Sequence, residues 1–376
     1  MSEIQTQLAI ARPAGLELQL KEQRRSVDFD TFDIHLQQLL TSLTDGQIWV
    51  SPAYQRKFRW KEDRCSQLIE SVLLGIPVPS MFMATNENGT WEVVDGLQRL
   101  SAIVKFAGDE SLRKKIIIPS PNVVNNDELV LTDLKKLTKF NGLTYRELPQ
   151  GIQTHFKTRP MKVITLNDKS ETRVRYDLFE RLNTGGVALS SQEIRDCVYQ
   201  GKFANKLEEL SKQPAFQTTL NLTPLQQRDG TAEECVLRFF AFLDRYKKFD
   251  HSVKDFLDDY MQASTKGFDY SAKEAIFNLT FSKLAKVFPT GISRYATSKF
   301  GRRGTTPLNL YEGVSVGAAL AIRKTGDLIV NDLNKWMAAT TLRDFTTGAT
   351  NSRPAVAGRI EFCRDRFIGK PYVEPS

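Results

Sequence analysis

The stretch WEVVDGLQRLSAIVKF, residues 91–106, decides how the first part of this chain folds. Its apolar run ends at Asp95 and Gly96, and a helical pattern begins at once with Gln98 and Arg99 at its start. The stretch therefore predicts a strand-to-helix corner at which an acid, a glycine, an amide and a guanidinium meet.

Two interpretations of this corner are open. In the simpler one, Asp95 caps the following helix and the polar residues are solvated, which is what the corner favours when it is taken alone. In the other, the helix N-terminus binds a phosphate, because its free N–H groups and positive dipole end attract anions. Gly96 would let the backbone approach the phosphate, and Arg99 would add a forked positive charge. Asp95 would hold Mg²⁺ or orient a water, with Gln98 positioning either one.

Length and composition suit a globular protein of two domains. The chain has 376 residues, of which 41% are hydrophobic and 26% charged, and no apolar run approaches a membrane span. The N-terminus lacks the pattern of a secretory signal, so we expect a cytoplasmic protein without a membrane partner. The net charge of +8 suits polyanionic partners such as nucleic acid or nucleotides.

Cysteines and histidines indicate no metal centre. The four cysteines form no C-x-x-C pair, and Cys197 and Cys235, which lie in helical patterns, are expected to be buried free thiols. The three histidines lie far apart, and none has a partner three or four residues away, so a histidine-metal nuclease is poorly supported.

The pattern of elements predicts an α+β fold followed by helices. We expect an N-terminal arm at residues 1–29, a mixed α/β domain at 30–167 and a mostly helical domain at 168–376. Within these, the sequence predicts helices at 31–44, 61–75, 97–107 and 149–157, an extended stretch at 48–60, a hairpin of 81–85 with 91–95, and strands at 114–119, 128–132 and 161–166.

A second motif is YQRKFRW, residues 54–60, in which rings alternate with Arg56, Lys57 and Arg59. It is either an aromatic plug with solvated basic residues or a surface for base stacking and phosphate contact.

A third motif is FERLNTGGVALSSQEIRD, residues 179–196. A glycine-stopped helix and a second helix with a capping box at Ser190 and Glu193 account for most of it. The cluster of Arg181, Asn183 and Thr184 at the first helix end is not explained in this way and is a candidate for ligand contact.

A fourth motif is the loop SRYATSKFGRRGTTP, residues 293–307, which contains no acid. Such a loop is most often solvated, but it is also the first candidate for contacting DNA phosphates. The residues concerned are Arg294, Lys299, Arg302 and Arg303.

These motifs in this order resemble the DGQQR-motif family of bacterial proteins, over roughly residues 30–265. The family has a fold like ParB and sulfiredoxin, and it includes the N-terminal half of the GmrSD type IV restriction system and of SspE, a defence protein that acts with phosphorothioate-modified DNA. The resemblance implies nucleotide binding and hydrolysis that serve a nuclease. The matching segments are YQRKFRW, QLIESVLLGIPVPSMFM, WEVVDGLQRLSAI, FERLNTGGVALSSQEIRD and VLRFFAFLDRY.

Carried over by position, the family motif falls on Asp95, Gly96, Gln98 and Arg99, with Leu97 in place of its first glutamine. This departure leaves hydrolytic turnover open. A sulfiredoxin-type cysteine is absent from the corner, which argues against peroxiredoxin repair.

A second departure concerns the nuclease. Members of the family that cut DNA carry an HNH nuclease towards the C-terminus, whereas no histidine follows His251 here. A separate nuclease or effector subunit would then be the partner that cuts.

The leading hypothesis is a nucleotide-binding, DNA-associated protein of a restriction-type or antiviral defence system that binds a nucleoside triphosphate with Mg²⁺. A non-enzymatic ParB-like DNA-binding protein is the alternative, and a DNase is the least supported. The base of the nucleotide and the oligomeric state stay open. The candidate residues are Asp95, Gln98 and Arg99 for catalysis, with Asp95 also for the metal, and Arg56, Arg59, Gly96, Arg99, Arg181, Asn183 and Thr184 for the nucleotide.

Overall fold

The computed structural model describes residues 16, 28–50, 58, 60–86, 88–117, 127–167, 176–178, 180–181, 190–293 and 305–373. The chain divides into two compact units, residues 1–188 and 189–376. The first unit is mixed α/β and the second is helical, which confirms the predicted fold class. The boundary predicted after residue 167 falls before this division, and its position stays a prediction because residues 168–175 and 182–189 lie outside the described part.

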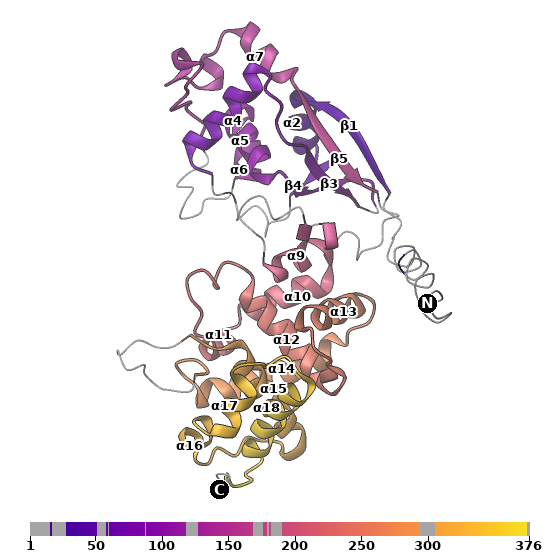
Figure 1. The fold of residues 1–376 in the computed structure, drawn as a ribbon, viewed down its shortest axis with the longest axis vertical. Helices are drawn as coiled ribbons and strands as arrows, with labels where there is room; N and C mark the ends of the chain where they lie inside the picture. The colour runs from indigo at the N-terminus through magenta and orange to yellow at the C-terminus, as the bar shows by residue number, and fades with distance from the viewer. Residues whose placement is uncertain are drawn as a thin grey trace, which may run out of the picture. The chain divides into compact units, whose positions relative to one another are not determined.

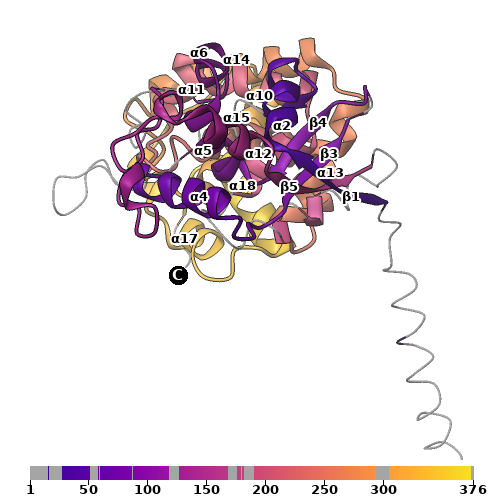
Figure 2. The same ribbon diagram turned by 90° about the horizontal axis from the view of Figure 1, so that it is seen from above.

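The first unit is built on a five-stranded mixed sheet with the strand order β1-β5-β3-β4-β2 (Figure 1). β3 is antiparallel to β4 and parallel to β5, β1 is antiparallel to β5, and β2 is parallel to β4. β1 therefore forms one edge of the sheet, beside β5 (Figure 2). The bounds of the strands are Phe29–His35 for β1, Ile48–Trp49 for β2, Met81–Thr85 for β3, Trp91–Asp95 for β4 and Pro160–Leu166 for β5.

The helices of the first unit follow the local signals in the sequence. α4 ends at Gly75, whose left-handed backbone lets the N–H groups of residues 75 and 76 bond the last carbonyls of the helix. α4 packs beside α5, and the predicted hairpin of β3 and β4 is confirmed. The bounds are Leu36–Thr44 for α2, Glu62–Leu74 for α4, Leu97–Ala107 for α5, Glu110–Ile116 for α6 and Gln150–Lys157 for α7, with 3-10 turns at Thr138–Phe140 (η1) and Tyr145–Glu147 (η2).

The helix predicted at residues 31–44 is correct only from Leu36 onward. Residues 29–35 form β1, which pairs with β5 along its whole length. Phe32 lies in this strand, on the same face as the buried Ile34. The helical pattern of residues 31–44 is used only from Leu36 onward. Before it, pairing of seven residues with β5 determines the structure.

Two predicted strands are wrong. Residues 114–116 of the first belong to α6, and residues 128–132 of the second form no strand. In the second case Leu129 donates its N–H to the carbonyl of Lys105, and Leu131 bonds the backbone of Leu143. Short apolar runs do not distinguish a strand from a helix end or a buried turn, and in the second case distant backbone contacts decided the structure.

The second unit is an assembly of helices around an aromatic core. Phe216, Phe239, Phe277 and Phe281 contact one another ring to ring, with Tyr311 against two of them. The bounds are Ser191–Val198 for α9, Lys202–Ser211 for α10, Pro214–Thr219 for α11, Thr231–Arg245 for α12, Tyr246–Lys248 for the 3-10 turn η4, Val253–Lys266 for α13, Tyr270–Val287 for α14, Leu308–Thr325 for α15, Leu333–Met337 for α16, Thr340–Thr346 for α17 and Arg353–Phe367 for α18.

All four cysteines are buried free thiols, which confirms the prediction made for Cys197 and Cys235. Among the described helices, none combines the length and apolar character needed to cross a membrane.

Candidate functional site

The corner between β4 and α5 is built around a glycine. β4 ends at Asp95, and Gly96 is the N-cap of α5. Its φ of +111° lies in the left-handed region, which glycine adopts readily. A Cβ added to Gly96 would lie 3.0 Å from Met81 Cγ and 3.3 Å from Arg99 Nη2. The turn therefore requires glycine both for its backbone angle and for the close approach of Arg99.

Asp95 and Arg99 form an ion pair across the corner. Arg99 Nη2 donates to Asp95 Oδ2 at 2.7 Å. The alternative in which Asp95 caps α5 is wrong, because Gly96 occupies the N-cap position and no side chain caps the helix. The side chain of Asp95 is 38% exposed and that of Arg99 is 12% exposed. The carboxylate thus stays accessible to a ligand while it holds the guanidinium in place.

Gln98 joins the corner to the aromatic-basic motif. Its Oε1 accepts the backbone N–H of Trp60 at 3.2 Å, and the guanidinium of Arg64 lies 4.8 Å from the centre of the Trp60 ring. Phe58, two residues earlier, is 1% exposed and belongs to the core. The first two motifs therefore meet, and at least one ring of the second is a core side chain.

The N-termini of α4 and α5 lie close together because of this contact. Trp60 directly precedes Lys61, the N-cap of α4, and Gln98 lies in the first turn of α5. Neither helix has a side-chain cap. Glu62 and Asp63 offset the positive end of α4, whereas the first turn of α5 contains no acidic residue. The N-terminus of α5 is therefore the positive end that an anion would meet.

The thiol of Cys65, in the second turn of α4, is unreactive at neutral pH. Burial raises the pKa of the Cys65 thiol to about 12, although the nearby charge of Lys105 lowers it. Lys105 is itself buried and donates to Glu62 Oε1 at 3.0 Å. Cys65 therefore stays protonated at neutral pH and packs as a small apolar side chain.

The third motif divides between the two units. Arg181 is helical and exposed. Ser190 begins α9, and the predicted capping box is confirmed: the Ser190 hydroxyl accepts the N–H of Glu193, and the carboxylate of Glu193 accepts the N–H of Ser190. Arg195, further along α9, is buried in the helical unit. The end of this motif thus has a structural role.

Several candidate residues lie outside the described part of the chain, and their roles stay predictions. They are Arg56, Arg59, Asn183 and Thr184 around the nucleotide and Arg294, Lys299, Arg302 and Arg303 in the basic loop.

The helical unit contains a buried chain of alternating charges that we did not predict. Burial opposes the ionisation of Glu234, yet Arg238 and Arg195 outweigh it and hold the pKa of Glu234 below its ordinary value. Only Glu234 and Arg238 stand four residues apart; the other pairs join residues 39 to 74 positions apart, so the sequence carries no local signal for them. In order, the chain is Asp258, Arg195, Glu234, Arg238, Glu312 and Arg359.

A divalent metal at the corner would have one protein ligand among the described residues. No group of three His, Cys, Asp or Glu residues in that part of the chain is arranged to hold a metal ion. Asp95 nevertheless fits Mg²⁺, which commonly takes one or two carboxylates, substrate phosphates and waters.

The mixed α/β unit with this corner belongs to a known class of domain. Residues 36–200 match the family described as "GmrSD restriction endonuclease, N-terminal domain". This part of the chain is therefore a GmrSD-type N-terminal domain, which confirms the resemblance over these residues.

The other comparisons add little. A solved Pnob8-like ParB-N domain is 11% identical, with alignment over 91% of this chain and 98% of that one, but its TM-score of 0.23 supports no inference. No curated protein matches the chain.

Proposed function

We propose that the DGLQR corner, residues 95–99, binds the phosphates of a nucleoside triphosphate together with Mg²⁺. The observation that carries this proposal is the Asp95–Arg99 pair at an uncapped helix N-terminus that has no acidic residue in its first turn. The N–H groups and the guanidinium suit the anion, and the accessible carboxylate suits the metal.

The pair does not have to break for a ligand to bind. A guanidinium has five N–H donors and a carboxylate has two oxygens, so each partner can keep the 2.7 Å bond and still contact a ligand. Asp95 holds Arg99 in one orientation, which lowers the entropy lost when a phosphate binds. Gln98 fixes the start of α4 through Trp60, and in this way keeps the two helix N-termini together.

Leu97 is a core residue of the first unit. The residue that departs from the family motif is 2% exposed, so its side chain faces the core. In this chain the position contributes no group to the accessible side of the corner. Hydrolysis would depend on Asp95 and on how Mg²⁺ and water are arranged with the phosphates.

Titration calorimetry with the four triphosphates and Mg²⁺ tests the binding proposal. Arg99→Ala should weaken binding at least about tenfold, because a hydrogen bond from a charged donor contributes about 1.5–3 kcal/mol. Arg146→Ala is the matched control, since Arg146 is in the same unit, is 67% exposed and pairs only loosely with Glu128. Absence of binding to every triphosphate in the wild type, or equal affinity in Arg99→Ala, would refute the proposal.

We further propose that the protein is associated with DNA in a restriction-type defence system. The name of the matching family and the net charge of +8 support this role. No histidine follows His251, so these residues do not supply the histidines of an HNH nuclease, and cutting would require a nuclease outside them.

Phosphate release from the four triphosphates, measured with and without duplex DNA, tests this wider role. Release that rises with DNA supports nucleotide turnover coupled to DNA. Salt-dependent DNA binding in gel shifts that is unchanged by added nucleotide would instead favour a DNA-binding protein without turnover.

A further inference from the structure

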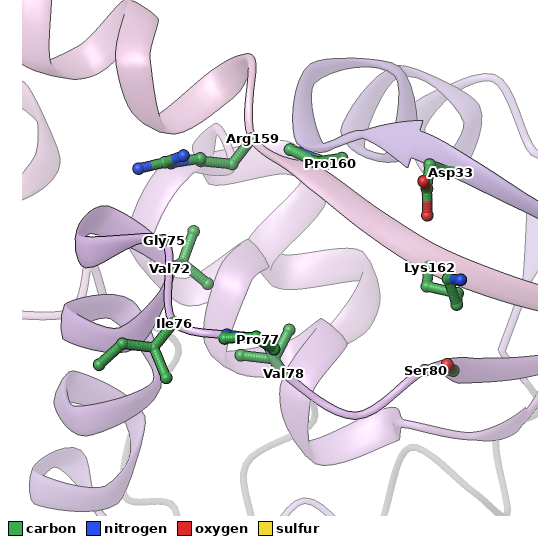
Figure 3. Close-up of a pocket in the computed structure, with 10 residues that line it drawn as sticks. All are labelled: Asp33, Val72, Gly75, Ile76, Pro77, Val78, Ser80, Arg159, Pro160 and Lys162. Carbon is green, nitrogen blue, oxygen red and sulfur yellow. The ribbon is translucent and has the colours of Figure 1, made fainter.

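The first unit contains a pocket of about 350 Å³ that none of residues 95–99 lines (Figure 3). β3 and β5 pair from Met81 and Val163 onward, and the pocket lies where the chain segments leading into these two strands separate. Its volume falls within the range of about 300–1,000 Å³ that is typical of small-molecule sites.

One side of the pocket carries two opposite charges that do not pair. Asp33 and Lys162 are direct partners in the β1–β5 register, so both side chains project from the same face of the sheet. Ser80 lies on the same side of the pocket (Figure 3). Within the described residues, none of these three side chains makes a hydrogen bond or an ion pair. The pocket thus offers an acceptor, a cation and a hydroxyl close together.

The opposite side of the pocket is apolar. It is formed by Val72 in the last turn of α4 and by Ile76, Pro77 and Val78 in the loop that leads to β3. Ile76 is 51% exposed, so its side chain offers accessible apolar surface on this side.

Arg159 also lines the pocket, but its guanidinium is turned away from the charged side (Figure 3). Its Nη2 donates to the carbonyl of Leu73 at 3.2 Å and so caps the C-terminal end of α4. Lys162 is therefore the cation that faces a ligand.

We propose that this pocket binds a free apolar α-amino acid in its zwitterionic form. The carboxylate would bond Lys162 and Ser80, and the ammonium group would bond Asp33. The side chain would cover Val72, Ile76 and Val78.

The charge arrangement favours a zwitterion over simple anions, simple cations and neutral apolar molecules. A simple anion would be repelled by Asp33 and a simple cation by Lys162, while a neutral apolar molecule would leave both charges without a partner. Side chains that stand opposite each other on paired strands have Cβ atoms about 5 Å apart. The two charges of a zwitterion are adjacent as well, so one molecule can meet both.

Titration calorimetry on the full chain with three related ligands tests the proposal. L-leucine should bind at least about tenfold more tightly than L-leucinamide, which lacks the carboxylate, and than N-acetyl-L-leucine, which lacks the ammonium group. A tenfold difference corresponds to about 1.4 kcal/mol, below the contribution of a typical charged hydrogen bond.

Variants assign each preference to a residue. Lys162→Met should bind L-leucine and L-leucinamide equally, and Asp33→Asn should bind L-leucine and N-acetyl-L-leucine equally. Both positions are exposed, so circular dichroism should show unchanged folding. Lys139→Met, at another exposed lysine of the same unit, should keep both preferences.

Three results would overturn the proposal. The first is no binding of L-leucine at about 10 mM, a concentration that would detect even a weak site. The second is equal affinity of the wild type for the three ligands. The third is a preference that survives in Lys162→Met and Asp33→Asn. The nucleotide titration is independent of all three, because the two sites share no residue.

Discussion

Replacement of Glu312 by alanine should destabilise the helical unit by about 4 kcal/mol, since breaking one partner of a buried ion pair costs about 3–5 kcal/mol. Glu312 is 1% exposed and bonds both Arg238 and Arg359. After the change, Arg238 would keep Glu234 at 2.6 Å, whereas Arg359 would keep only backbone carbonyls, of which that of Thr350 at 2.8 Å is the nearer. The cost therefore comes mainly from the buried charge of Arg359.

Thermal unfolding and hydrogen exchange can measure this cost. For a unit of this size, 1 kcal/mol shifts the melting temperature by about 2–4 °C, so 4 kcal/mol corresponds to a fall of about 8–16 °C. Exchange should rise in peptides from α12, α15 and α18, the helices that carry Arg238, Glu312 and Arg359. Glu209→Ala is the matched control, because its side chain is 57% exposed, and its melting temperature should stay within about 2 °C of the wild type.

A double variant separates the loss of a partner from the loss of packing. Glu312→Met with Arg359→Met removes both charges and should be more stable than Glu312→Met alone, because no buried charge is left without its partner at that end of the chain. A fall of less than about 3 °C in Glu312→Ala, or additive effects in the double variant, would show that the network contributes little.

Three further predictions follow from single contacts. Gly96→Ala should lower the free energy of unfolding in urea more than Gly46→Ala does. Both glycines have positive φ, where strained backbone costs about 1–3 kcal/mol, but only Gly96 has atoms within 4 Å of the added Cβ. Equal losses would contradict the argument. The pKa of Glu234 is lowered in the folded protein, so its contribution to stability is present above the ordinary value of 4.5 and is lost as the pH falls through the folded pKa. Glu234→Gln should therefore reduce the dependence of the unfolding free energy on pH in the acid range. An unchanged slope would count against the network. Ser190→Ala should cost about 1 kcal/mol through loss of the capping bond, measured by denaturant unfolding, whereas Ser191→Ala, one residue later, should cost less.

Local signals explain the parts of the fold that the sequence predicted correctly. The helix that ends at Gly75, the hairpin of β3 and β4, and the capping box at Ser190 and Glu193 each depend on residues close together in the chain. Periodicity, a left-handed stop and a reciprocal cap act within a few residues, so they can be recognised without knowledge of the rest of the molecule.

The sequence also determined which residues meet at the corner, but the tertiary structure decided what they do there. Asp95 is bound to Arg99 instead of capping the helix, and Gln98 is engaged by Trp60, which lies 38 positions earlier in the chain. Leu97 is in the core, so in this chain the position contributes no polar group to the accessible side. A one-residue shift of the N-cap to Gly96 made these differences, and the motif alone does not specify it.

Long-range pairing accounts for the remaining differences. Residues 29–35 are a strand because β5, about 130 positions later, offers seven paired residues. The charge chain from Asp258 to Arg359 and the juxtaposed charges of Asp33 and Lys162 likewise depend on segments that only folding brings together. Composition and local pattern thus determined the fold class and the candidate corner of this protein. Its edge strand, its buried charges and the pocket beside β3 and β5 were decided by tertiary contacts, because they depend on partners that are distant in sequence.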